Sequence, residues 1–142
     1  MEYRQATDTD LARIEELLRD SNLPFSDCVE HIDNFIIKEE NNILVGIGCI
    51  EIYGSYGLIR SIAVNQNHRK NGVAKNILKI IRQRAFDSGV TRIYLLTETA
   101  IDYFNKLNFK DVKRSDVPDS IKNTKQFKEF CPSSAVVMYS DI

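Results

Sequence analysis

The 142-residue sequence lacks the features that mark several protein classes. It has no excess of one charge, because 19 Lys and Arg oppose 20 Asp and Glu; this gives no support for nucleic acid or a membrane surface as the main partner. No apolar run approaches the roughly 20 residues that cross a bilayer. The first four residues do not resemble the start of a signal peptide. The sequence therefore predicts a cytoplasmic protein without nucleic acid or membrane as a partner.

Cysteine and histidine are also scarce. Cys28, Cys49 and Cys131 are odd in number and widely spaced, so we expect reduced thiols rather than a disulfide framework or a zinc site. Two histidines alone, His31 and His68, give little basis for a metal centre; we interpret them as a helix-end and a loop residue. Internal repeats and linkers are missing as well, so the sequence predicts a single domain over residues 1–142.

An apolar strand, a polar turn and a helix start follow one another over residues 61–78. The β-branched stretch 62–64 ends a buried strand, and residues 65–67 are turn-forming. Residues 69–74, Arg-Lys-Asn-Gly-Val-Ala, then bring two cations and a glycine to the first helical turn. Free N–H groups and the helix dipole make this an anion site, and Gly72 would let a ligand approach the backbone closely. The pattern predicts a bound phosphate or pyrophosphate.

The whole chain predicts a mixed α/β (α+β) fold. Expected strands cover residues 2–6, 34–39, 43–52, 58–64, 91–97, 109–112 and 135–139. Expected helices begin at Thr7 or Thr9, at 26–27, at 71 and at Thr97 or Thr99, with a short one in 116–131. Tight turns join the strands from 34 to 64 into an antiparallel meander, whereas strand 91–97, reached through a helix, should lie parallel to its predecessor. The sheet is therefore mostly antiparallel with one βαβ unit.

Two segments resemble a known family. Residues 69–74 match the R/Q-x-x-G-x-G/A turn of the GNAT N-acetyltransferases, and residues 97–109 resemble that family's A-x-x-f-y-x-k-x-G-F segment. Residues 58–64 and the pair Tyr103-Phe104 look most like the N-acetylglutamate-synthase-like branch, which acetylates amino acid α-amino groups. Residues 51–54, 58–61, 94–97, 121–124, 127 and 131–135 look closer still to the small acetyltransferases named after arsenic-resistance operons.

The resemblance implies acetyl-CoA as the cofactor, used as a co-substrate without a metal. Its pyrophosphate would lie on the amides of residues 69–74, with Lys70 or Lys75 adding charge. Its pantetheine arm would pair with the strand backbone at 62–64, and its acyl carbonyl would face the N–H of Val64. The predicted cofactor-binding residues are Ile62, Ala63, Val64, Arg69, Lys70, Asn71, Gly72, Val73, Ala74 and Lys75.

The resemblance also implies an acceptor. We expect a small primary amine that carries a carboxylate, namely the α-amino group of an amino acid or of a toxic amino-acid analogue. Arg60 interrupts an apolar strand and could hold that carboxylate by a bidentate pair, or could pair structurally with Glu51. Tyr53 and Thr97 are the other predicted substrate-binding residues. Such a domain would be a monomer or a homodimer.

The usual acid–base groups of the family are missing. Leu58 stands where many relatives carry a glutamate, and Phe104 stands where a tyrosine often protonates the leaving thiolate. The available substitutes are Glu51 as base and Tyr103 or Tyr56 as acid. Glu51 is either the solvent-facing residue of a strand edge or a base in the cleft, and Tyr103 is either a core or a catalytic residue.

Two other functions stay open at this stage. A GNAT fold without chemistry could serve as an acyl-CoA-binding module or sensor, which Leu58 and Phe104 would permit. An acetyltransferase for protein N-termini would need an open peptide groove, whereas residues 115–134 look able to close over the site. Arg114 could face an acidic substrate or lie at a solvated strand end.

Overall fold

The computed structural model describes residues 2–69, 71–130 and 134–142. Its strands form one seven-stranded sheet in the order β1-β2-β3-β4-β5-β7-β6, and helices flank the sheet, as expected for a mixed α/β fold. The chain forms two compact units, residues 1–51 with 61–84 and residues 52–60 with 85–142. Strands β3 (Ile43–Tyr53) and β4 (Tyr56–Val64) and helix α2 (Val73–Asp87) contribute residues to both.

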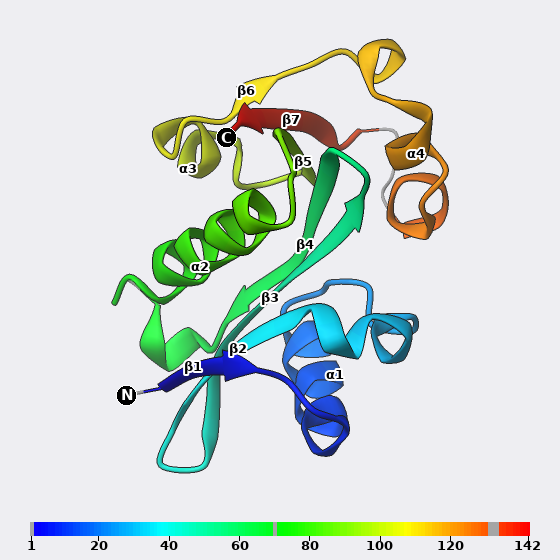
Figure 1. Cartoon of the computed structure of the whole chain (residues 1–142). Coiled ribbons are helices and arrows are strands. Elements are labelled where there is room, and N and C mark those ends of the chain that lie inside the picture. Colours follow the sequence, from blue (N-terminus) through cyan, green and yellow to red (C-terminus); the bar gives the residue numbers. More distant parts are fainter. Residues whose placement is uncertain (1, 70, 131–133) are drawn as a thin grey trace. The chain divides into compact units, whose positions relative to one another are not determined.

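The first unit contains an antiparallel sheet with a helix beside it (Figure 1). Strand β1 (Glu2–Gln5) pairs with β2 (Phe35–Glu40), which pairs with β3. Helix α1 (Leu11–Asp20) follows the 3-10 turn η1 (Asp8–Asp10), and the 3-10 segment η2 (Cys28–Asn34) leads into β2. Apolar side chains of these elements form one core: Ala6, Ile14, Leu17, Leu18, Cys28, Ile32, Phe35, Ile37, Leu44, Ile47, Cys49 and Ala63. The predicted elements of this region are confirmed.

The hairpin between β2 and β3 turns on two asparagines. Asn41 and Asn42 have φ values of 51° and 65°, the left-handed pair that a tight two-residue hairpin requires. The pairing register shifts between Lys38 and Glu39, so a bulge precedes this turn. The tight turn and the antiparallel pairing predicted between strands 34–39 and 43–52 are confirmed.

Helix α2 lies on two glycines of β3. A Cβ at Gly46 would come within 2.5 Å of Val73 Cγ1, and a Cβ at Gly48 within 2.5 Å of Ile77 Cγ2. Any side chain at either position would push the helix away, because packed interiors leave no spare room. These glycines therefore fix how closely the start of α2 approaches the sheet.

The second unit places the last strand of the chain inside the sheet. The first half of β4 runs parallel to β5 (Arg92–Thr97), with Tyr56 opposite Arg92 and Leu58 opposite Tyr94. Strand β7 (Val136–Asp141) pairs antiparallel with β5 on one side and with β6 (Lys110–Asp111) on the other, as Figure 1 shows. The parallel pair is confirmed, whereas the sequence did not predict that β7 separates β5 from β6.

Short helical segments complete this unit. They are α3 (Ile101–Lys106), η4 (Arg114–Asp116), α4 (Asp119–Lys122) and the π-helical turn η5 (Gln126–Phe130). Helix α3 starts later than the predicted Thr97 or Thr99, and β6 is shorter than the predicted 109–112. Leu58, Tyr94, Val117, Ile121 and Val137 form the buried core.

Cys28 and Cys49 are buried in the core of the first unit, while Cys131 lies outside the described residues. In the part of the chain that the structure describes, no helix combines the length and the apolar character needed to cross a membrane.

Candidate functional site

The turn between β4 and α2 is held by local hydrogen bonds. Asn65 N–H donates to Val45 O at 2.7 Å, and the Asn65 side chain accepts from Asn67 N–H at 3.0 Å, which forms the 3-10 turn η3 (Gln66–His68). Arg69 Nε then donates to Val64 O at 3.3 Å. These bonds close the turn that the asparagines predicted. They also commit part of the Arg69 guanidinium to the end of β4.

Gly72 prepares the start of α2 for an anion. Its φ of 76° is left-handed, and a Cβ built there would find no atom within 4 Å, so the space in front of its backbone is open. Asn76 N–H donates to Gly72 O at 3.0 Å, which closes the first helical turn. The N–H groups of residues 72–75, which come before that bond, have no partner within the helix, and the Lys75 side chain is exposed beside them. The chemistry of this segment fits a pyrophosphate; Lys70 lies outside the described residues.

Strand β4 contains one strained residue. Ser61 has φ of 60°, a left-handed conformation that costs a non-glycine residue about 1 kcal/mol. Beyond it, the Ile62 side chain reaches the place of the missing Gly48 side chain, and Ala63 is part of the core with Ile47. Within the predicted pantetheine segment, the Ile62 side chain therefore packs against β3 and Ala63 lies in the core, while Val64 is half-buried. No pattern in the sequence indicates this conformation of Ser61, because nothing in the flanking residues marks a break in the strand.

Glu51 is buried on the face of β3 that carries Ile47 and Cys49. Its Oε2 lies 3.6 Å from His31 Nε2, which is 3.7 Å from Asp27 Oδ2. The solvent-facing interpretation of Glu51 is therefore wrong. His31 lies within η2, close to two carboxylates. The sequence analysis predicted neither His31 nor Asp27 as a site residue. Their i, i+4 spacing was the signal that could have indicated the pair.

Strand β4 carries Leu58 and Arg60 into the second unit. Leu58 is completely buried against Tyr94, so this side chain serves as a core residue. Arg60 is 4% exposed, so its charge lies in the interior. Tyr53 is half-buried against the same apolar cluster as Leu58. The predicted substrate residues of this unit are therefore packed rather than free in solvent.

The two neighbouring aromatic residues of α3 have opposite surroundings. Phe104 is buried and meets Phe109 edge-on at 5.6 Å, whereas Tyr103 is 40% exposed. The core interpretation of Tyr103 is therefore wrong, and Phe104 is the core ring. Partial burial raises the pKa of the Tyr103 phenol, so this group is suited to donate a proton rather than to accept one.

Two other candidates have structural contacts. Tyr56 meets Tyr94 edge-on at 6.1 Å. Thr97 Oγ1 accepts from Ala100 N–H at 3.0 Å and so fixes the turn that leads into α3. Each contact gives the residue a structural role that needs no ligand.

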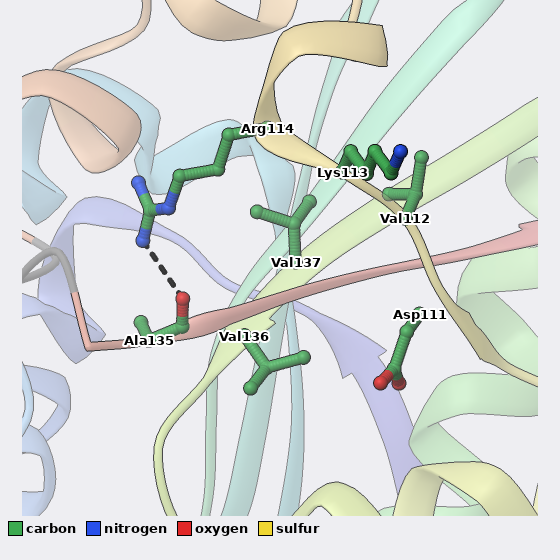
Figure 2. Close-up of a pocket in the computed structure, with 7 residues that line it drawn as sticks. All are labelled: Asp111, Val112, Lys113, Arg114, Ala135, Val136 and Val137. Atoms are coloured by element: carbon green, nitrogen blue, oxygen red, sulfur yellow. Dashed lines mark hydrogen bonds between the residues drawn. The ribbon is translucent and has the colours of Figure 1, made fainter.

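A hollow of about 300 Å³ lies where β6 and β7 diverge (Figure 2). Its lining is Asp111, Val112, Lys113, Arg114, Ala135, Val136 and Val137. Arg114 Nη2 donates to Ala135 O at 2.8 Å, and the guanidinium stacks on Phe127 at 5.2 Å. Arg114 is thus half-buried and anchored, not a solvated strand end. The hollow offers two cations and one carboxylate to a small polar ligand.

The described residues show no group of three or more His, Cys, Asp and Glu side chains with the geometry of a metal site. The predicted cofactor residues and Glu51 belong to the first unit, and Arg60, Tyr53, Thr97 and Tyr103 belong to the second.

Comparison with known proteins adds three findings. A model of the acetyltransferase (GNAT) family matches residues 3–109. An uncharacterised N-acetyltransferase of Chlorobaculum tepidum is 23% identical over 94 residues, which are 66% of this chain and 60% of that protein. An amino-acid acetyltransferase of Buchnera aphidicola is 30% identical over 95 residues, 64% of this chain and 21% of that protein. The chain therefore spans less than two thirds of the length of either relative.

Among solved structures, the fold resembles N-acetylglutamate synthase from Neisseria gonorrhoeae, which was determined with coenzyme A and N-acetyl-glutamate. The TM-score is 0.86 at 19% identity, and the match covers 99% of this chain and 34% of that one. At this identity the likeness concerns the fold.

Proposed function

Because the chain belongs to the acetyltransferase (GNAT) family, we propose that it transfers an acetyl group from acetyl-CoA to the primary amine of a small molecule. The acceptor in this proposal is the α-amino group of an amino acid or of a toxic amino-acid analogue.

One observation carries the proposal: an open, left-handed Gly72 opens a 15-residue helix directly after β4. The pyrophosphate of acetyl-CoA would accept hydrogen bonds from the amides of residues 71–74, near the positive end of α2. Lys75 would add charge. The pantetheine arm would follow the backbone of 62–64, and the acyl carbonyl would face Val64 N–H.

The chemistry requires a neutral amine, a stabilised oxyanion and a proton for the departing thiolate. Glu51 is our candidate for the base and Tyr103 for the acid, while Leu58 and Phe104 are core residues without a chemical role. A coenzyme A thiolate leaves without strong assistance. Positioning of the amine therefore supplies much of the rate enhancement.

Several observations support an amino acid as the acceptor. The Buchnera relative is named an amino-acid acetyltransferase, and the Neisseria synthase was solved with N-acetyl-glutamate. Arg60 and Arg114 are the candidate partners of an acceptor carboxylate, since arginine binds carboxylates in a bidentate manner. The segments that resemble arsenic-resistance acetyltransferases add toxic glutamate-like analogues to the candidates.

The deciding experiment incubates the protein with acetyl-CoA and a panel of amines, and detects acetylated products by mass spectrometry. The panel pairs each amino acid with the amine that lacks its carboxylate, and includes short peptides. We expect turnover of an amino acid and at least tenfold lower kcat/KM for its decarboxylated partner. Tight acetyl-CoA binding without turnover of any amine would establish the sensor instead, and turnover of peptides alone would establish an N-terminal acetyltransferase.

A further inference from the structure

Two carboxylates from different elements converge on one imidazole in the first unit. His31 Nε2 lies 3.6 Å from Glu51 Oε2 on β3 and 3.7 Å from Asp27 Oδ2, at the start of η2. The carboxylate side chains are 4% and 2% exposed, whereas the His31 side chain is 22% exposed. The imidazole thus connects two buried acidic groups with the solvent.

Local structure does not require this arrangement. Asp27 precedes η2, yet its side chain makes no capping hydrogen bond to that segment. The backbone leaves helical geometry at His31, where φ is −118° and ψ is 16°. Buried carboxylates in proteins are paired or hydrogen-bonded, and the His31 imidazole is a neighbour that Asp27 and Glu51 share.

The cluster lies on the face of the sheet opposite to α2. Glu51 shares its face with Ile47 and Cys49, which pack in the core with α1 and η2. Gly46 and Gly48 present the other face to α2. The helix that would anchor the cofactor and the buried carboxylate therefore occupy different faces of β3, so the proposed nucleotide anchor does not cover Glu51.

The proposed reaction releases a proton. An ammonium group loses two protons as its nitrogen forms the amide bond, while the thioester C–S bond breaks and the thiolate takes up one of them. One proton per turnover must therefore leave the site for solvent. A buried Glu51 that accepts it cannot pass it directly to bulk water, but an imidazole in contact with both can, since imidazole changes charge near neutral pH.

We propose that Glu51, His31 and Asp27 form the route by which this proton leaves the protein. This inference rests on the proposed acetyltransferase function. Glu51 takes a proton from the acceptor amine, His31 takes it from Glu51 and delivers it to water, and Asp27 orients the ring and stabilises its charged form. His31 is a positioning residue that acts through Glu51.

The test compares four variants with the amine that the wild type turns over best. His31→Gln should lower kcat by about tenfold between pH 6 and 8 and leave the KM for acetyl-CoA unchanged. Imidazole added to the assay should restore most of the lost rate. Glu51→Gln should lose as much activity and flatten the acid side of the pH profile, without rescue by imidazole. Asp27→Asn should show a smaller loss.

Asp33→Asn is the matched control, because Asp33 is an exposed carboxylate on the same η2 segment; its kcat should equal that of the wild type. Product is measured by mass spectrometry, because imidazole itself cleaves thioesters slowly. If the melting temperature of the His31→Gln variant is well below that of the wild type, the His31→Asn variant is used instead. A wild-type rate in a folded His31 variant, or a loss that imidazole does not relieve, overturns the route alone. Absence of wild-type turnover overturns the acetyltransferase function together with it.

Discussion

Single residues decide what the site can bind. Gly72 has a left-handed backbone and open space in front of it, as a ligand-binding turn requires. Gly89, with φ of 85°, is equally left-handed and open but lies at the opposite end of α2. Substitutions at the two glycines therefore distinguish the free-energy cost of backbone strain from the loss of a binding surface.

Gly72→Ala should weaken acetyl-CoA binding at least tenfold, because its methyl group enters the space of the pyrophosphate. Gly89→Ala should cost a similar 1 kcal/mol or so of stability from backbone strain while leaving the affinity unchanged. Isothermal titration with acetyl-CoA measures the affinity, and urea unfolding measures the stability. Equal affinities of the two variants would remove Gly72 from the cofactor site.

The Tyr103 phenol has a pKa raised by partial burial, so it stays protonated across the ordinary assay range. If Tyr103 donates the proton to the thiolate, Tyr103→Phe should lower kcat by about tenfold, by the same factor at every pH from 6 to 9. The KM for acetyl-CoA should not change. Tyr139→Phe, on β7 under Arg92, is the control and should keep full activity. If the Tyr103→Phe variant were as fast as the wild type, Tyr103 would not be the proton donor to the thiolate.

At the scale of elements, one ionic network joins β1, η1, α1 and β2. Asp10, buried, accepts from both terminal nitrogens of Arg4 at 2.9 Å, from Arg13 at 2.7 Å and from Thr7 N–H at 2.8 Å. Glu39 pairs with the same two arginines. The hydrogen bonds from Arg4 hold the pKa of Asp10 well below its ordinary value, although burial opposes this. The network fixes α1 to the sheet.

A lowered pKa means that the Asp10 contribution is complete above the unfolded value near pH 4 and disappears as the pH falls toward the folded value. Asp10→Asn should therefore cost about 2 kcal/mol at pH 7, and the difference from the wild type should narrow steadily below pH 4. Urea unfolding at pH 7, 5 and 3 measures both effects. The exposed neighbour Asp8→Asn should change stability by less than about 0.5 kcal/mol. A difference that does not depend on pH would mean that packing, not charge, anchors the helix.

For the molecule as a whole, net charge gives no attraction for an anionic cofactor. The formal charge is −1 and the isoelectric point is about 6.1. In the proposed function, affinity for coenzyme A must therefore come from local contacts, chiefly the turn at residues 69–74, and not from long-range attraction.

This predicts which ligands protect the fold from heat. Acetyl-CoA and coenzyme A at a hundredfold excess over Kd should each stabilise the protein by about 2.7 kcal/mol, which corresponds to a rise in Tm of about 10 °C. Acetyl-pantetheine lacks the pyrophosphate and at the same concentration should raise Tm far less. Differential scanning fluorimetry with the three compounds decides this. Equal shifts from all three would place the main anchor on the pantetheine arm instead of the turn.

Local sequence patterns predict the strands and turns of residues 34–64, the helix that follows them, the parallel pair and the anion turn. The structure confirms the first three. Each depends on a few consecutive residues: Asn41-Asn42 for the hairpin, Gly72 and Gly89 for the helix ends, and apolar periodicity for the rest. Local backbone preference is strong enough to specify such features without the remainder of the chain.

Features that join residues from different elements became known from the folded structure. It inserted β7 between β5 and β6, buried Glu51 beside His31, made Phe104 rather than Tyr103 the core ring, and held Ser61 in a left-handed conformation. Burial and charge pairing depend on neighbours from other elements, as with His31 and Glu51, and strain at one residue persists only when the surrounding packing fixes it. The proposed cofactor turn can therefore be predicted from consecutive residues, whereas the proposed proton chemistry depends on which side chains the fold brings together.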